Sequence, residues 1–228
     1  MNGRLITIDG LDGSGKATQT ELLCEELERR GVKLRRVSFP DYTSESSALV
    51  KMYLNGAFGG TPEDVNAYAA SSFFAVDRYS SFTRGWKEDY QNGTLIVADR
   101  YTTSNIIYQL PKLPGKEWES YMEWVQDFEY GKLELPRPDL TIYLELPPEI
   151  SQKLLDERYH GEAGKKDIHE SNTGYLSACR ESADYAARRL GWKTVACEDG
   201  GSPKTREAIH AEIIRIVLEE FHDQFWLS

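Results

Sequence analysis

The stretch IDGLDGSGKATQ, residues 8–19, matches the phosphate-binding pattern G-x-x-x-x-G-K-[ST] at every fixed position except the last. Gly10 and Gly15 let the backbone turn its N–H groups toward one centre, and Lys16 adds a cation that can bridge phosphate oxygens. Ala17 stands where the pattern has a hydroxyl that helps to hold Mg²⁺. The stretch predicts a nucleoside triphosphate site that lacks one common metal ligand. The structural alternative is a glycine-rich turn with a chance lysine.

Three carboxylates could compensate for the missing hydroxyl. Asp9 ends a predicted strand, Asp12 lies inside the loop, and Asp99 follows another strand. Because Mg²⁺ often keeps several waters, it needs few protein ligands. We expect Asp12 and Asp99 to hold Mg²⁺, directly or through water. Capping or turn formation is the alternative role for Asp9 and Asp12.

Two further patterns could recognise a second substrate. Arg100, in DRY at 99–101, could grip a phosphate with two hydrogen bonds, although a structural ion pair with a neighbouring acid is an equal alternative. In FFAVDRY at 73–79, Phe74 and Arg78 are four residues apart on a predicted helix and therefore share a face. Together they could stack on a flat base and hydrogen-bond it. A core phenylalanine beside a surface arginine is the structural alternative.

The elements that must position these residues alternate between short apolar runs and longer helical patterns. Strands are predicted over residues 5–8, 33–39, 94–98, 139–146 and 193–197, and helices over residues 15–30, 61–92, 116–131, 147–158, 173–191 and 203–222. Thr61 and Pro62 form a helix-start signature. The polar residues 159–170 are predicted to be a mobile loop.

This alternation predicts an α/β fold: a five-stranded parallel sheet with helices on both faces. With the phosphate loop, it is a three-layer sandwich of the P-loop NTPase type, formed as a single domain over residues 1–228. Ligands of such sheets bind at the carboxyl ends of the strands. Each suggestive segment follows a predicted strand: residues 10–18, 39–42, 99–105 and 158–167. We expect them to converge.

The composition narrows the class of partner. The formal net charge is −10, which is unfavourable for binding a nucleic-acid backbone. Three cysteines without metal-ligand spacing favour free thiols in a reducing compartment. The sequence shows no secretory signal at its start and no apolar run of about 20 residues. We therefore expect a cytoplasmic protein with neither a nucleic-acid nor a membrane partner.

Taken together, the segments resemble thymidylate kinases, which phosphorylate dTMP with ATP. The resemblance covers nearly the whole chain: the phosphate loop, F-P after the second strand, F-A-V-D-R, D-R-Y-T-T-S-N, P-R-P-D-L and a lid ending in D-I-H-E. It implies that ATP and Mg²⁺ are used and that the loop binds ATP through Gly10, Leu11, Asp12, Gly13, Ser14, Gly15, Lys16, Ala17 and Thr18.

The resemblance also implies the acceptor site. Phe74 would stack on thymine, Arg78 would hydrogen-bond a carbonyl, and Arg100 would contact the dTMP phosphate. Tyr108 matches an aromatic residue that crowds the sugar 2′ position and favours deoxyribose. The remaining expected substrate contacts are Asp12, Phe39, Tyr42, Ser104 and Asn105. A homodimer through helices flanking the F-x-x-x-R helix is also implied.

The lid, residues 158–170, should supply a catalytic cation. Family members with an acid in the phosphate loop, like Asp12, take arginines from the lid. Arg158 is preferred because a planar guanidinium spans transferring oxygens better than an ammonium does. Lys165 and Lys166 are the alternatives, and Asp167 and Glu170 match an acidic pair that orders the lid. The expected catalytic set is Lys16, Asp99, Arg100 and Arg158.

Three departures from the family pattern stand out. Asp41 replaces an arginine that often follows F-P, Asp9 replaces a glutamate, and Ala17 replaces the hydroxyl. Without a cation at residue 41, Arg100 would carry more of the phosphate contact, and Tyr42 remains a plausible neighbour. Similar enzymes tolerate a residue without a hydroxyl at the position of Ala17, which favours a working site.

The expected mechanism needs no general base, because the acceptor phosphate is already anionic at neutral pH. None of the four histidines, His160, His169, His210 and His222, follows a predicted strand. Three alternatives remain: a kinase that phosphorylates a nucleoside hydroxyl and uses Asp9 or Asp99 as base, a P-loop ATPase acting as a switch, and a non-catalytic descendant.

Overall fold

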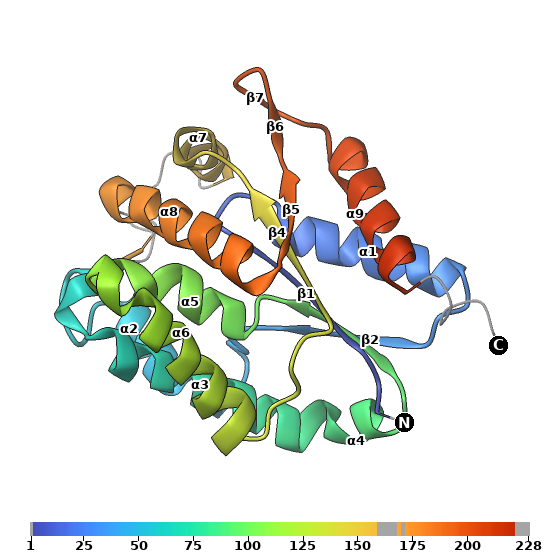
Figure 1. The fold of residues 1–228 in the computed structure, drawn as a ribbon, viewed down its shortest axis with the longest axis horizontal. Coiled ribbons are helices and arrows are strands. Elements are labelled where there is room, and N and C mark those ends of the chain that lie inside the picture. Colours follow the sequence, from blue (N-terminus) through green and yellow to red (C-terminus); the bar gives the residue numbers. More distant parts are fainter. Residues whose placement is uncertain (1, 159–167, 170–171, 222–228) are drawn as a thin grey trace.

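A computed structural model describes residues 2–158, 168–169 and 172–221, apart from the side chains of residues 156–158 and 173. Its centre is a parallel five-stranded sheet in the order β2-β3-β1-β4-β5 (Figure 1). The strands are β1 (Leu5–Gly10), β2 (Leu34–Ser38), β3 (Leu95–Asp99), β4 (Leu140–Glu145) and β5 (Lys193–Ala196). The predicted α/β class and the five parallel strands are confirmed.

The register brings the chemistry-bearing ends of three strands together. Ile8 of β1 is opposite Asp99 of β3, and Gly10 of β1 is opposite Leu144 of β4. All six residues of β1 are buried. A central parallel strand covered on both faces reads as a continuous apolar run, as residues 5–8 do.

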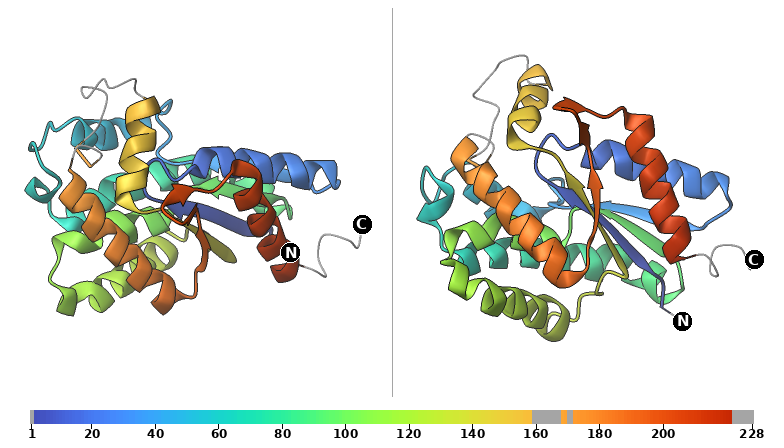
Figure 2. Two further views of the ribbon diagram at one scale, coloured as in Figure 1. Left: turned by 90° about the horizontal axis from the view of Figure 1, so that it is seen from above. Right: turned by 45° about the horizontal axis from the view of Figure 1, so that its top comes forward.

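Helices cover both faces of the sheet (Figures 1 and 2). On one face, α1 (Lys16–Arg29) and α9 (Arg206–Glu220) pack on each other and on the strands, around a core that includes Ile8, Leu23 and Ile213. On the other face lie α5 (Thr102–Gln109) and α8 (Thr173–Leu190), and α3 (Ala67–Ser81) and α6 (Trp118–Gln126) pack outside α5. The three-layer arrangement follows from β-α-β connections that cross both faces.

The remaining elements are short. They include α2 (Ala48–Leu54), α4 (Lys87–Gln91), α7 (Pro148–Arg158) and a two-stranded hairpin of β6 (Glu198–Asp199) and β7 (Ser202–Pro203). Helical turns are η1 (Glu45–Ser47), η2 (Pro62–Asp64), η3 (Phe82–Trp86), η4 (Leu110–Lys112), η5 (Gly115–Glu117) and η6 (Asp127–Lys132). None of the helices within the described ranges is long and apolar enough to cross a bilayer.

Two predicted helix starts were misplaced. Thr61 caps the short turn η2, and Asn66 caps α3 by accepting a hydrogen bond from the Ala69 amide at 2.9 Å. The predicted 61–92 helix is therefore divided into η2, α3, η3 and α4. The last helix begins at Arg206 instead of residue 203, because Gly200 and Gly201 turn the chain into the β6–β7 hairpin.

Candidate functional site

A cavity of about 1240 Å³ opens at the carboxyl ends of the strands. Segments far apart in the sequence form its wall: the loop after β1, the loop after β2, α3, the β3–α5 junction and the segment after β5. Of the expected site residues it contains Asp12, Gly13, Ser14, Gly15, Lys16, Ala17, Thr18, Phe39, Tyr42, Phe74, Arg78, Asp99, Arg100, Ser104, Asn105 and Tyr108. Gly10 and Leu11 lie at the base of the loop, where Leu11 is fully buried.

The loop after β1 curls around one centre. Gly13 and Gly15 have φ angles of 83° and 87°, which glycine adopts at no steric cost. A Cβ on Gly10 would lie 2.6 Å from the Leu144 carbonyl oxygen, so only glycine fits there. Lys16 is buried, and its ammonium donates to the Leu11 carbonyl at 2.7 Å. Burial and the neighbouring Arg100 lower the pKa of Lys16.

Asp12 connects the loop to the β3–α5 junction. Its Oδ1 accepts a hydrogen bond from Arg100 and lies 3.7 Å from the Lys16 Nζ, and its Oδ2 accepts from the Tyr108 hydroxyl at 2.8 Å. Burial would raise the pKa of Asp12, but Arg100, Lys16 and the Tyr108 hydroxyl outweigh it and lower that pKa. Two cations from different segments therefore share one carboxylate.

Arg100 has a φ of 65°, in the left-handed region that non-glycine residues rarely adopt. Its amide donates to the Ile8 carbonyl at 3.0 Å, which ties it to the end of β1. Such strain persists where the surroundings hold it, commonly at ligand sites. The structural alternative for Arg100, an ion pair, is present, and the pair lies inside the cavity.

Asp9 has a positioning role. It is fully buried, and its Oδ2 accepts from Thr103 Oγ1 at 2.5 Å and Ser104 Oγ at 2.7 Å, while its Oδ1 accepts from the Gly10 amide at 2.8 Å. Asp9 therefore fastens the first turn of α5 to the phosphate loop. This is the structural alternative noted from the sequence, and it also fixes the orientation of Ser104.

Asp99 ends β3, and its buried Oδ1 has no hydrogen-bond partner within the described parts of the chain. Burial raises the pKa of Asp99, against the lowering effect of Lys16 and Arg100. Because both oxygens of Asp12 are already engaged, Asp99 is the better fit of the two to a cation. No group of three or more acidic, histidine or cysteine ligands occurs among the described residues.

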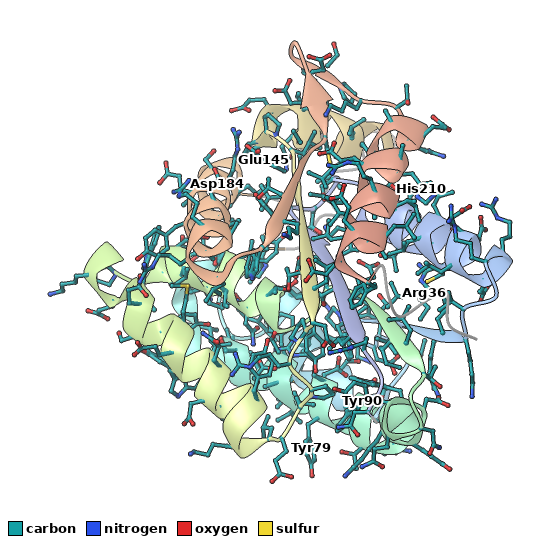
Figure 3. The ribbon with its side chains drawn as sticks, turned by 45° about the vertical axis from the view of Figure 1, so that its right-hand side comes forward. Arg36, Tyr79, Tyr90, Glu145, Asp184 and His210 are labelled. Atoms are coloured by element: carbon teal, nitrogen blue, oxygen red, sulfur yellow. The ribbon has the colours of Figure 1, made fainter. Side chains whose placement is uncertain are left out.

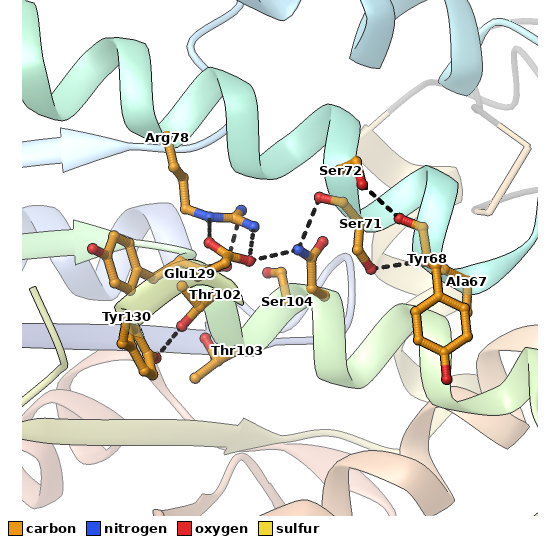
Figure 4. Close-up of polar contacts among 12 residues, drawn as sticks. Ala67, Tyr68, Ser71, Ser72, Arg78, Thr102, Thr103, Ser104, Glu129 and Tyr130 are labelled. Carbon is orange, nitrogen blue, oxygen red and sulfur yellow. Dashed lines mark hydrogen bonds and ion pairs between the residues drawn. The ribbon is translucent and has the colours of Figure 1, made fainter. Parts of the chain in front are cut away.

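A second polar network lies at the α3 side of the cavity (Figure 4). Arg78, only 1% exposed, donates from Nε and Nη2 to the two oxygens of Glu129 at 2.7 and 2.6 Å. Asn105 donates to the same carboxylate at 2.8 Å and to the Ser71 carbonyl at 3.2 Å. Burial opposes the charge on Arg78, but Glu129 outweighs it and raises the Arg78 pKa. The alternative of a surface arginine is therefore wrong.

The loop after β2 is held from α3. Asp77 is buried, and it accepts hydrogen bonds from the Asp41 amide at 2.8 Å and the Ser46 hydroxyl at 2.7 Å. The Asp41 carboxylate accepts from the amide and hydroxyl of Thr43 at 3.1 and 2.7 Å. Asp41 therefore shapes the loop, while Tyr42 and Lys51 of α2 line the cavity.

Several functional candidates were missed from the sequence. Glu129 lies in a helical run whose pattern does not distinguish it from surface acids, and His169 lines the cavity although it follows no strand. Another end of the cavity is formed by residues that only the fold brings to Gln19, namely Leu146, Leu154, Leu155, Cys197, Pro203, Lys204, Thr205, Arg206 and Ile209. Arg158 ends α7, but its side chain, Lys165, Lys166, Asp167 and Glu170 lie outside the described residues.

Comparison with known proteins gives consistent matches. The sequence profile of the family "Thymidylate kinase" matches residues 8–210. A thymidylate kinase of Schizosaccharomyces pombe is 33% identical over 149 residues, which is 65% of this chain and 64% of that protein, so the chain spans less than two thirds of it. One from Mycobacterium tuberculosis H37Rv is 32% identical over 162 residues, 70% of this chain and 72% of that protein.

The fold is also similar to a solved structure. A thymidylate kinase from Candida albicans aligns with a TM-score of 0.67 over 96% of this chain and 92% of its own, at 22% identity. At that identity the likeness supports the architecture alone, and the sequence matches carry the family.

Proposed function

The chain belongs to the thymidylate kinase family, and we propose that it transfers the γ-phosphoryl group of ATP to dTMP, giving ADP and dTDP. One observation carries this proposal: Lys16 of the phosphate loop and Arg100 of the DRY segment both lie against Asp12 in a single cavity. A donor phosphate on Lys16 and an acceptor phosphate on Arg100 would then be neighbours.

In this proposal the chain aligns the substrates and neutralises charge. Lys16 and the loop amides bind the donor phosphates, while Arg100 leaves Asp12 to take the acceptor phosphate. Phe74, Arg78 and Asn105 form the wall for the base, and Phe39, Tyr42, Ser104 and Tyr108 complete the acceptor pocket. Arg158, or Lys165 and Lys166, would supply the lid cation.

Mg²⁺ would supply charge neutralisation between the donor phosphates when bound. Asp99 is the residue that would hold it, because its Oδ1 accepts no hydrogen bond from any residue that the structure describes. Asp12 would contribute, directly or through water, only after releasing Arg100 or Tyr108. Ala17 is exposed on the cavity wall, so its missing hydroxyl leaves room for a water in the same place.

The nucleoside-kinase alternative needs a free carboxylate as general base. Asp9 does not suit that role, because it is fully buried and accepts three hydrogen bonds. Asp99 has a free oxygen, but Arg100 would then lack an acceptor phosphate. The geometry therefore favours a nucleotide acceptor.

We also propose a homodimer. Tyr68, Val76 and Tyr79 are exposed on α3, and Val76 and Tyr79 follow Tyr68 by 8 and 11 residues, so the three lie on one side of the helix. Leu49 and Met52 are exposed on α2, which packs against α3. Large apolar side chains in one area favour a protein–protein contact. Light scattering should give twice the chain mass, and Val76→Arg should halve it.

A cytoplasmic location, without a nucleic-acid partner, is part of the same proposal. Cys24, Cys179 and Cys197 are buried free thiols, which suits a reducing compartment. The net charge of −10 disfavours nucleic acid.

The test is a coupled ADP-release assay with ATP and Mg²⁺ that compares dTMP, dUMP, thymidine and no acceptor. Turnover with dTMP that disappears without acceptor, or with EDTA, is expected. Equal ADP release with and without acceptor would indicate an ATPase, preference for thymidine would indicate a nucleoside kinase, and no turnover would favour a non-catalytic descendant.

A further inference from the structure

His169 lies in the cavity wall within a cluster of tyrosines. It is 4% exposed, and its ring stacks on Tyr108 with centroids 5.2 Å apart and planes 12° apart. The rings of Tyr53 and Tyr175 are 5.4 and 5.5 Å away. Tyr175 also donates its hydroxyl to the Tyr108 carbonyl. Tyr108 is therefore contacted on its ring by His169 and on its backbone by Tyr175.

A hydrogen-bond chain fixes the orientation of the His169 ring. The Lys112 ammonium can only donate, and it lies 2.8 Å from the Tyr53 hydroxyl oxygen and 2.9 Å from the Val65 carbonyl. The Tyr53 hydroxyl oxygen lies 2.8 Å from His169 Nε2, and we infer that it donates its proton there while it accepts from Lys112. This arrangement needs a neutral imidazole protonated at Nδ1.

Tyr108 in turn reaches the reacting centre. Its hydroxyl donates to Asp12, and the Arg100 guanidinium lies 5.5 Å from its ring centroid. A shift of the Tyr108 ring would therefore change both the space beside the acceptor sugar and the contact to Asp12. The imidazole that packs flat on this ring is the side chain best placed to prevent such a shift.

We propose that His169 is a positioning residue that determines sugar specificity: oriented by Tyr53, its ring holds Tyr108 where the tyrosine excludes a 2′-hydroxyl. The inference rests on the proposed dTMP kinase function. It assigns His169 no direct part in phosphoryl transfer.

The test compares kcat/KM for dTMP with that for its ribonucleotide counterpart, ribothymidine monophosphate, in the full chain. His169→Phe keeps a ring without an acceptor, His169→Gln keeps an acceptor without a ring, and His169→Ala has neither. The ratio in favour of dTMP should fall roughly threefold to tenfold in His169→Phe and in His169→Gln, which is the scale of one aromatic or hydrogen-bond contact. It should fall further in His169→Ala. The KM for ATP should not change.

Tyr53→Phe provides a second route that leaves the histidine in place. It should lower the ratio as His169→Phe does, and the double variant should lose no more than either single one, because both remove the same hydrogen bond. His210→Phe is the matched control. His210 lies on α9 (Figure 3), beside charged residues of α1, and it is not one of the described residues that line the cavity, so the ratio should stay as in the parent.

Nitrogen-15 NMR of the histidine rings measures which ring nitrogen of His169 carries the proton, and it does not depend on enzyme activity. His169, identified by its loss in His169→Gln, should be the Nδ1–H tautomer in the parent and should change in Tyr53→Phe. An Nε2–H tautomer would overturn the inference. The inference would also be overturned if the parent were active and all variants kept the parental dTMP preference, even with lower melting temperatures or kcat. The dTMP kinase proposal would stand in that case. A parent that phosphorylates no nucleotide would overturn both.

Discussion

The two ends of the cavity differ in how many buried polar atoms have hydrogen-bond partners. We call the end beside Arg78 and Asn105 the acceptor end and the end beside Ser14 and Gln19 the donor end, after the proposed substrates. At the acceptor end, Arg78, Glu129 and Asn105 form a closed network of buried ion-pair and amide hydrogen bonds. The buried Gln109 amide is the exception there, because it has no hydrogen-bond partner within the described residues. At the donor end, three buried polar atoms of cavity-lining residues have no hydrogen-bond partner in the parts of the chain described: Ser14 Oγ, Gln19 Oε1 and Asp99 Oδ1.

This difference indicates that the Arg78–Glu129 network at the acceptor end forms without a ligand, and we expect a ligand to complete the donor end. Buried polar atoms in native proteins are nearly always paired, so each exception calls for an explanation. A bound phosphate and its Mg²⁺ would provide one here. Changes at the acceptor end should therefore destabilise the fold as well as weaken binding, and changes at the donor end should weaken binding without destabilising the fold.

The largest effect is expected where the two ends meet. Arg100→Ala removes the cation proposed for the acceptor phosphate and leaves Asp12 with Lys16 and Tyr108 as its neighbours. We expect kcat/KM for dTMP to fall by roughly 10³-fold or more, the scale found for arginines in phosphoryl transfer. The ADP-release assay measures it. Arg4→Ala, which breaks a pair with Asp139 at the opposite end of the sheet, is the control. Retention of a tenth of parental activity would contradict the role of Arg100.

The next largest effect is expected in the closed network of Arg78, Glu129 and Asn105. Glu129→Ala leaves the Arg78 guanidinium buried without its carboxylate and should destabilise the fold by about 3–5 kcal/mol. Glu129→Gln, which keeps an oxygen and the volume, should cost less. Urea unfolding without ligand measures both. Glu119→Ala, which breaks an exposed pair with Arg189, should change stability little. If Glu129→Ala resembled that control, the acceptor end would not be a self-supporting unit.

The same contrast explains what the sequence could predict. The phosphate loop was predictable because Gly10, Gly15 and Lys16 are close in sequence and because the backbone geometry at Gly10 and Gly15 requires glycine. Arg100 and Asp99 were predictable because they directly follow a strand, and parallel strands bring their carboxyl ends together. Local signals of this kind also gave all five strands of the sheet.

Residues whose role depends on a distant partner could not be predicted. Glu129 is one acid in a helical run, and only the packing of η6 beside α3 pairs it with Arg78. The split of the 61–92 helix arises because Asn66 is a better cap for the packed helix than Thr61. His169 and the segment after β5 reach the cavity through tertiary packing that leaves no pattern in the sequence.

A smaller effect should appear in the pH dependence of stability at the acceptor end. Burial and the positive charges of Lys112 and Arg100 lower the pKa of His169 from 6.5 to about 3, although the negative charge of Asp12 acts in the opposite direction. As the pH falls, the imidazole of residue 169 therefore takes up its proton at a higher pH in the unfolded chain than in the folded one. Stability from this group is complete above pH 6.5 and is lost as pH falls toward 3, by about 2 kcal/mol between pH 7 and 5. Urea unfolding at both pH values should show that loss in the parent and a smaller one in His169→Gln. Equal losses would mean that His169 is solvated.

The smallest effect, and one of opposite sign, is expected at the donor end. Ser14 is buried beside Gly10, and its hydroxyl lacks a partner within the described residues. Removing an unpaired buried hydroxyl relieves a desolvation cost, so Ser14→Ala should leave the free protein as stable or more stable by up to about 1 kcal/mol. The same variant should weaken ATP binding, because the hydroxyl is then missing from the phosphate cradle. Thermal unfolding with and without ATP and Mg²⁺ separates the two effects. If Ser14→Ala destabilised the free protein as Glu129→Ala does, the donor end would be as self-supporting as the acceptor end, and the distinction between them would fail.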